Sequence, residues 1–155
     1  MLLDYRGGRI FGGRFMKETF SRKAQEIMNE RFGHDTLIGL ATIDDKIPNV
    51  RTVNAYYEKG AFYIITYGLS NKMKQLEKNS NVGICGDWFT AHGKGVNLGW
   101  FCKEENKDIA DKLKKAFNEW IDNGHNNFDD KNTVILCIQL TDGILFSHGT
   151  RYDID

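Results

Sequence analysis

The sequence lacks the features that would place the protein in a membrane or in an oxidising compartment. No apolar run approaches the roughly 20 residues that a membrane-spanning helix needs, and no charged N-terminal region is followed by an apolar stretch and a cleavage site. There are only three cysteines, Cys85, Cys102 and Cys137, and their spacing fits neither a disulfide framework nor a zinc site. We therefore expect a cytoplasmic protein whose cysteines are reduced and mostly buried.

The sequence also has no net charge. Lys and Arg together number 21, as do Asp and Glu. Because such a chain has no overall field to attract nucleic acid or an anionic membrane, we expect neither as a partner. An anionic ligand must then be held by a local group of basic residues. The four histidines are not spaced as metal ligands on a helix, so we expect no metal site.

The length of the chain favours one domain preceded by a short leader. A chain of 155 residues with 41% hydrophobic content can bury one sizeable core. Residues 1–15 have no helical or strand period and contain two Gly-Gly pairs, so we expect them to be disordered or loosely docked. Two other interpretations are an RGG-type nucleic-acid arm and a translated upstream region before a true start at Met16. The domain itself is expected to span residues 16–155.

Hydrophobic periodicity predicts a mainly β protein with three helices. Apolar residues three and four positions apart predict helices over 17–32 and 104–123, and Ser70 is suited to cap a third over 71–78. Thr141-Asp142-Gly143 is a strong turn signal. Short β-branched and apolar runs predict strands over 36–43, 49–57 (directly after Pro48), 61–66, 82–87, 88–100, 133–140 and 144–150. Because these strands meet mainly through short hairpins, an antiparallel barrel or sandwich is favoured over a doubly wound sheet.

Basic and hydroxyl residues gather around the helix at 71–78. Arg51 lies inside one predicted strand, Thr66 ends the next, and Ser70 and Lys72 open the helix. A helix N-terminus offers free N–H groups and a partial positive charge of about half a unit, so these groups together suit a phosphate monoester. The alternative is structural: Arg51 forms a cross-strand ion pair with Glu58 or another acid, Ser70 is only a cap, and Lys72 is solvated.

Four motifs follow one another in this region: P-x-x-R-x-V, F-Y-x-x-T, S-x-K-x-x-Q-L and N-x-x-V. Their residues are Pro48, Arg51 and Val53; Phe62, Tyr63 and Thr66; Ser70, Lys72, Gln75 and Leu76; and Asn79 and Val82. In this order they resemble the FMN-binding segment of the pyridoxamine 5'-phosphate oxidase-like family, and residues 88–96 resemble that family's next strand. The resemblance implies a six- to seven-stranded antiparallel split β-barrel that binds FMN.

The resemblance also implies roles for particular residues. Arg51 and Lys72 would bind the FMN phosphate, helped by hydroxyl or backbone groups of Thr66 and Ser70. Three strand residues would run beneath the isoalloxazine ring and offer it backbone hydrogen bonds, namely Thr52, Val53 and Asn54. The family places FMN at a dimer interface, which implies a homodimer.

Aromatic residues are the candidates for the side of the flavin that the second subunit would cover. Trp88 and Phe89 begin the strand expected over 88–100. In a homodimer of this kind, one of them would lie against the flavin of the other subunit. The alternative is that these aromatics belong to the core.

Two departures separate the chain from the oxidase itself. Asn71 precedes Lys72 where the oxidase has an Arg-Lys pair, so one phosphate-binding charge is missing. Since a charged hydrogen bond is worth about 1.5–3 kcal/mol, we expect FMN affinity to be lower by tenfold or more. Tyr56 replaces a basic residue of the oxidase, and the chain ends at Asp155 without the oxidase's C-terminal tryptophan and arginine region. Pyridoxamine phosphate is therefore not the expected substrate.

The function implied is an FMN-dependent oxidoreductase that moves hydride or electrons between a nicotinamide donor and a small acceptor. Because a bound FMN carries the redox chemistry, no acid or base residue is obligatory, and no catalytic side chain is assigned. Two alternatives stay open. One is a flavin-binding stress or sensor protein without turnover, and the other is a family variant that binds haem or a deazaflavin in the same cleft.

Overall fold

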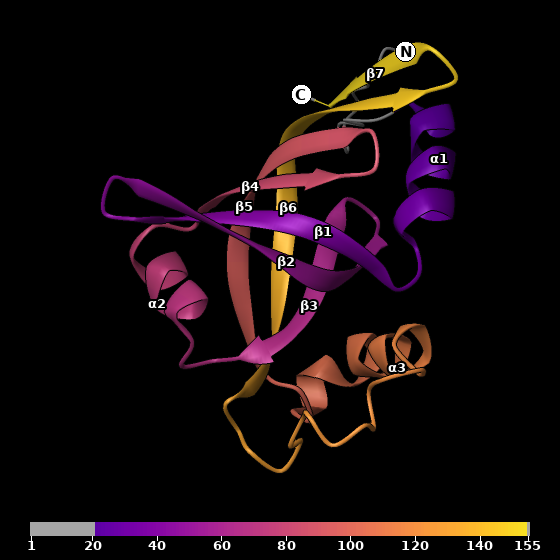
Figure 1. The fold of residues 1–155 in the computed structure, drawn as a ribbon. Coiled ribbons are helices and arrows are strands. Elements are labelled where there is room, and N and C mark those ends of the chain that lie inside the picture. Colours follow the sequence, from indigo (N-terminus) through magenta and orange to yellow (C-terminus); the bar gives the residue numbers. More distant parts are fainter. Residues whose placement is uncertain (1–20, 155) are drawn as a thin grey trace.

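The structure is a computed structural model that describes residues 21–154, so the leader expected over residues 1–15 lies outside the described part. Strands dominate it (Figure 1). The strands are β1 (Thr36–Asp44), β2 (Ile47–Glu58), β3 (Ala61–Tyr67), β4 (Asn81–Gly86), β5 (Phe89–Trp100), β6 (Thr133–Ser147) and β7 (Thr150–Ile154). The helices are α1 (Arg22–Phe32), α2 (Asn71–Lys78), the short 3₁₀ turn η1 (Glu104–Asn106) and α3 (Lys107–Ala116).

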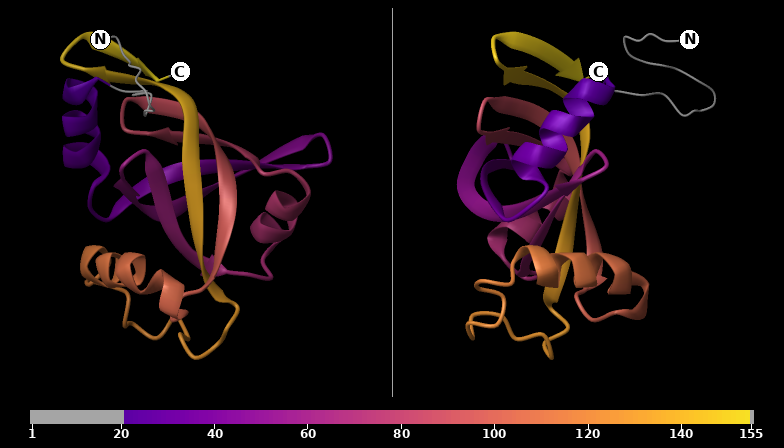
Figure 2. Two further views of the ribbon diagram at one scale, coloured as in Figure 1. Left: turned by 180° about the vertical axis from the view of Figure 1, so that it is seen from behind. Right: turned by 90° about the vertical axis from the view of Figure 1, so that its right-hand side faces the viewer.

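Six of the strands close an antiparallel barrel. Their order is β3-β2-β1-β4-β5-β6, and β3 pairs back with β6 to complete the ring. β7 is added to the free end of β6, and Figure 2 shows this hairpin standing at one end of the barrel. The mainly β, antiparallel split-barrel class predicted from the sequence is confirmed.

Local signals set the ends of two helices. Ser21 Oγ accepts a hydrogen bond from the Ala24 amide, so α1 begins at Arg22 and not at residue 17 as predicted. α2 spans the predicted residues, and its cap is Ser70. None of the described helices is long and apolar enough to cross a membrane.

The third helix is shorter than the predicted 104–123. It starts as the 3₁₀ turn η1 and ends at Ala116. Beyond this point the amides of Trp120 and Asn123 bond to carbonyls only three residues back, which forms turns instead of a helix. Phe117 and Ile121 are nevertheless buried, because they pack against the barrel. The spacing of apolar residues therefore continues past the end of the helix.

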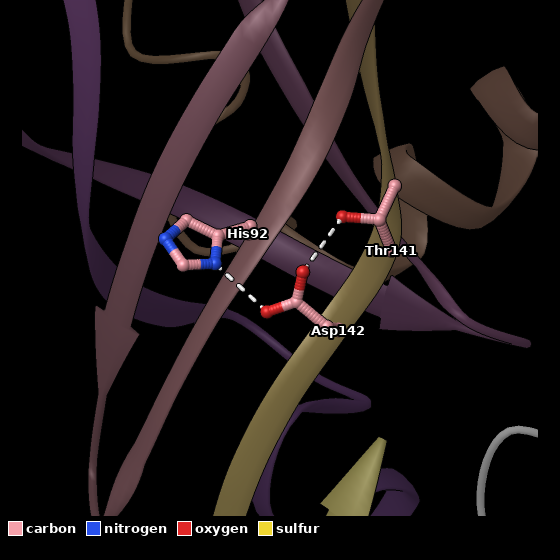
Figure 3. A network of polar contacts seen from close by, with 3 residues as sticks. All are labelled: His92, Thr141 and Asp142. Carbon is pink, nitrogen blue, oxygen red and sulfur yellow. Dashed lines mark hydrogen bonds and ion pairs between the residues drawn. The ribbon is translucent and has the colours of Figure 1, made fainter. Parts of the chain in front are cut away.

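The turn expected at residues 141–143 is absent, because β6 runs through it as one strand. Asp142 pairs with His92 and Leu140 pairs with Gly93, so Thr141 is an extra residue that forms a β-bulge. Figure 3 shows His92 and Asp142 facing each other across the bulge, with Nδ1 and Oδ1 2.8 Å apart. A Cβ on Gly143 would lie 2.9 Å from the Ala91 Cβ, so glycine serves close strand approach here.

The chain reverses further on, at the two residues between Ser147 and Thr150. His148 and Gly149 have φ of 50° and 79°. Two successive positive φ values suit a tight hairpin between twisted strands. The last strand is therefore β7, and His148 lies in a turn and not on a strand.

Two apolar clusters support the fold. The larger fills the barrel, and Phe32 of α1 packs there against Phe62 and Phe89. The smaller lies between α3 and the barrel, and includes Leu113 and Ile135. The expectation that the cysteines are mostly buried is wrong: Cys85 and Cys102 are exposed and only Cys137 is buried, although all three are free thiols.

Candidate functional site

The candidate site lies where β2 and β3 separate. β2 pairs with β3 only at Tyr56 to Glu58. Its earlier residues, 47–55, pair with β1, while β3 pairs with β6 along its whole length. Within residues 21–154, the earlier part of β2 therefore has one edge without a neighbouring strand. Backbone N–H and C=O groups on such an edge are available to a ligand. Figure 1 shows α2 on the side of the barrel to which the β1–β2 hairpin projects.

Arg51 lies on β2 and points toward the end of the barrel near α2. Its Nη1 donates to Thr42 Oγ1 at 2.7 Å and to the carbonyls of Leu40 and Asn49, each at 3.3 Å. Thr42 is fully buried and donates in turn to Gln75 Oε1 at 2.5 Å. Burial lowers the pKa of the Arg51 guanidinium. This chain of hydrogen bonds links β2, β1 and α2 and fixes the position of the guanidinium.

Lys72 is brought to the same place from the first turn of α2. Its Nζ donates to Thr66 Oγ1 at the end of β3. Burial lowers the pKa of the Lys72 ammonium, and the nearby charge of Arg51 lowers it further. Arg51 and Lys72 are thus close enough to repel one another, and we call them, with Thr66 and Ser70, the basic cluster.

The ion pair between Arg51 and Glu58, the structural alternative, does not form. Glu58 instead accepts hydrogen bonds from Lys112 at 2.7 Å and from the Tyr56 hydroxyl at 3.0 Å. In the described part of the chain, no carboxylate lies within ion-pair distance of Arg51 or Lys72. Two adjacent cations with no carboxylate nearby repel each other in the protein without a ligand. They therefore favour the binding of an anion.

The N-terminus of α2 completes the cluster. Ser70 Oγ accepts from the Met73 amide at 3.4 Å, so this hydroxyl caps the helix. The amides of Asn71 and Lys72 lie in the first turn, where an α-helix provides no acceptor for them. These donors and the two cations fit a phosphate group.

The three residues expected beneath a flavin ring lie on the part of β2 that pairs with β1 on one edge and with no described strand on the other. Thr52 is exposed, while Val53 packs against the barrel core. The Asn54 amide donates to Asp35 Oδ1 at 2.9 Å, and the other oxygen of Asp35 accepts from Trp120 Nε1 at 2.8 Å. The side chain of Asn54 is therefore already engaged, which leaves the backbone of this segment for a ligand.

The two aromatic candidates are separated from the basic cluster and from each other. Phe89 is only 2% exposed and packs in the core, the alternative considered for it. Trp88 is 70% exposed in the turn between β4 and β5, with its ring centroid 6.4 Å from that of Phe146. Trp88 lines a separate hollow of about 310 Å³ with Phe146 and Arg31.

A larger groove of about 780 Å³ adjoins the basic cluster, between α2 and the β1–β2 hairpin. Asn49, Asn71 and Gln75 are among its lining residues. Two residues in contact with the site were not assigned from the sequence, Thr42 and Gln75. The sequence does contain a signal for Thr42. It is a polar residue on the same face of β1 as the buried Ile38 and Leu40.

No protein-family profile matches the chain, and no curated protein is similar enough to count as a relative. Solved structures do match. A pyridoxamine 5'-phosphate oxidase-related, FMN-binding protein from Nostoc punctiforme has 16% identity and a TM-score of 0.55, with 85% of this chain and 88% of that chain covered. A FAD-binding protein from Mesorhizobium loti has 13% identity and a TM-score of 0.62, with 87% and 96% covered.

General stress protein 26 from Bacillus anthracis is a third similar structure. Its identity is 18% and its TM-score 0.58, with 77% of this chain and 91% of that chain covered. At such low identities the likeness establishes the fold. The chain has the split-barrel architecture of pyridoxamine 5'-phosphate oxidase-like proteins, as its motifs indicated.

Proposed function

We propose that the protein is a flavoprotein that binds FMN at the split between β2 and β3 and acts as an oxidoreductase. The observation that carries the proposal is the basic cluster, in which Arg51 and Lys72 lie together with no carboxylate of the described residues to neutralise them. The flavin-binding names of the proteins from Nostoc and Mesorhizobium support it.

The phosphate of FMN fits the chemistry of the cluster. A monoester carries up to two negative charges, which match one guanidinium and one ammonium group. The free amides in the first turn of α2 add donors, and the helix dipole favours an anion at this end. Thr66 holds Lys72 in place, and Thr42 holds Arg51.

From its phosphate, the flavin would extend along the edge of β2 that has no neighbouring strand within residues 21–154. Backbone groups of residues 52–54 on this edge can hydrogen-bond the polar edge of the ring. Bound FMN supplies hydride or electron transfer between a nicotinamide donor and a small acceptor, and the chain supplies position and electrostatics.

A second subunit is part of the proposal, since a flavin on an open strand edge needs a cover. Large apolar side chains near this edge are exposed, with Val50 at 73% and Leu37 at 62%. Two-fold symmetry would give a homodimer with two equivalent sites. Trp88 is sufficiently exposed to reach across such an interface.

Titration with FMN and with riboflavin tests the proposal. We expect the purified protein to be yellow, or to become so when FMN is added. Riboflavin lacks the phosphate and should bind at least tenfold more weakly, because it loses charge-assisted hydrogen bonds. Equal affinity for the two flavins, or no flavin absorbance after FMN is added, would contradict the proposed site.

A further inference from the structure

Three segments that are distant in the sequence surround the hollow that Trp88 lines. Arg31 comes from the last turn of α1, Trp88 from the turn between β4 and β5, and Phe146 and His148 from the end of β6 and the turn after it. Figures 1 and 2 show these two turns beside α1. The volume of about 310 Å³ is at the lower end of the range of about 300–1,000 Å³ common for small-molecule sites. None of the basic-cluster residues lines this hollow, so FMN bound as proposed does not account for it.

Two aromatic rings form the apolar part of the hollow. The ring centroids of Trp88 and Phe146 are 6.4 Å apart, and the ring planes are inclined at 71°. Both side chains are exposed, Trp88 to 70% and Phe146 to 39%. Because neither ring is enclosed by the core, each leaves aromatic surface against which a planar ligand can pack.

The backbone at Trp88 supports a role for its side chain outside the core. Its φ of 52° lies in the left-handed region, which is unfavourable for a bulky side chain and which glycine or asparagine adopts more readily. The Phe146 amide donates to the Trp88 carbonyl at 3.0 Å, which holds the turn against β6. The indole is mostly exposed, so its burial offsets little of this strain. Strained residues of this kind cluster at ligand sites.

Arg31 supplies the charge of the hollow. Its Nη1 donates to the carbonyl of Asp87 at 2.9 Å, which anchors the guanidinium beside the β4–β5 turn. In the described part of the chain, no carboxylate lies within ion-pair distance of Arg31, whereas Arg151 on β7 is paired with Asp153 at 2.8 Å. Because the contact with Asp87 uses one of five N–H groups, the guanidinium can still bind a planar carboxylate.

We propose that this hollow binds a small aromatic carboxylate, with its ring against Trp88 and Phe146 and its carboxylate on Arg31. Aromatic walls alone would suit an uncharged ring, and a cation alone would suit any anion, so the two side by side favour a ligand that has both groups. Ser147 and His148 line the same hollow, with Oγ and Nδ1 3.1 Å apart, and can hydrogen-bond further oxygen atoms of the ligand. The proposal does not depend on flavin binding.

Calorimetric titration of the intact protein with 2-naphthoate tests the proposal. The amide 2-naphthamide keeps both rings without the charge, and decahydro-2-naphthoate keeps the charge without aromatic rings. We expect 2-naphthamide to bind about tenfold more weakly than 2-naphthoate, because charge-assisted hydrogen bonds to Arg31 are lost. Decahydro-2-naphthoate should bind about threefold more weakly, because aromatic contacts are lost.

Two variants remove the two parts of the hollow separately. Arg31→Gln should weaken 2-naphthoate binding by about tenfold and leave 2-naphthamide binding unchanged, while its amide can still donate to the Asp87 carbonyl. Trp88→Asn should weaken the binding of both compounds, and asparagine suits the positive φ of this turn. Arg22→Gln removes an exposed arginine at the other end of α1 and is the matched control, which should change neither affinity.

The outcomes separate this hollow from the basic cluster. No binding of 2-naphthoate by the wild type, or equal affinity for 2-naphthoate and 2-naphthamide, would overturn the proposal. Loss of binding in Lys72→Ala with full binding in Arg31→Gln would also overturn it, because the carboxylate would then lie at the basic cluster. Arg31→Gln should keep wild-type FMN affinity, and circular dichroism would check that the variants fold.

Discussion

Glu58 and Arg51, which lie toward opposite ends of strand β2, differ in whether the described chain gives them a partner of opposite charge. At one end, Glu58 is held by Lys112 of α3 and by the Tyr56 hydroxyl. Toward the other end, the acceptors of Arg51 within residues 21–154 are carbonyl and hydroxyl groups, and its charge lowers the pKa of Lys72, another cation. A charge paired within the chain ties elements together, whereas charges left without a counter-ion are available to a ligand.

The pKa values reflect this difference. Burial alone would raise the pKa of the Glu58 carboxyl, but hydrogen bonds from Lys112 and Tyr56 outweigh it, and the pKa is lowered. Burial and then Arg51 lower the pKa of Lys72. The fold therefore favours the charged form of Glu58 and disfavours the charged form of Lys72. An anion bound at the basic cluster would favour the charged form of Lys72 and raise its pKa again.

Removing one cation of the basic cluster should have the largest effect. Arg51→Ala and Lys72→Ala should each weaken FMN binding by about 1.5–3 kcal/mol, because a charge-assisted contact to the phosphate is lost. Riboflavin binding should be nearly unchanged, as measured by flavin fluorescence titration. Glu58→Gln provides the control at the opposite end of β2 and should retain FMN affinity. Wild-type affinity in both alanine variants would show that the site assignment is wrong although the barrel is right.

Removing the paired charge should have a smaller effect, and on stability instead of binding. Glu58→Gln should lower the free energy of unfolding by roughly 0.2–1 kcal/mol, the range measured for exposed ion pairs. Since the folded pKa is lowered, this stabilisation is present above the ordinary value of 4.5 and is lost as the pH falls below it. Urea unfolding of both proteins at neutral pH and at pH values below this would measure it. A difference that stays constant with pH would contradict the role of the carboxylate.

The smallest effect is expected for Lys72→Met in the protein without flavin. Because the folded state disfavours a charged Lys72, removing this charge should leave stability unchanged or raise it by a few tenths of a kcal/mol, as is common for substitutions away from the core. Inorganic phosphate should raise the melting temperature of the wild type more than that of the variant. A marked loss of stability in the variant would mean that Lys72 has a structural role within the fold.

Local signals explain what the sequence predicted well. α2 has the predicted bounds because Ser70 caps it and the residues after Lys78 stop it, all within one short segment. The placement of Arg51, Thr66, Ser70 and Lys72 near one another also follows from element order, since β2, β3 and α2 are consecutive in the chain.

Contacts between distant segments explain what was missed. Gly143 resembles a turn glycine in its own segment, and only the pairing of β6 with Ala91 of β5 shows that it permits close approach. The role of Thr42 depends on Gln75, which lies on another element. The segment after α3 is held by distant residues, since Trp120 Nε1 donates to Asp35 and Phe117 is buried in one cluster with Ile135 of β6. Such effects cannot be read from a window of neighbouring residues.

Strand β6 has a consequence for the order in which the protein is made and folds. It pairs with β3, β5 and β7, and its pairing with β3 is the one that closes the barrel. The whole basic cluster precedes it in the chain, so these residues leave the ribosome well before β6 is synthesised. Closing a long loop costs chain entropy, and we expect β3–β6 pairing to come late in folding. Until then the edge of β3 is unpaired, and the newly made chain exposes it to aggregation.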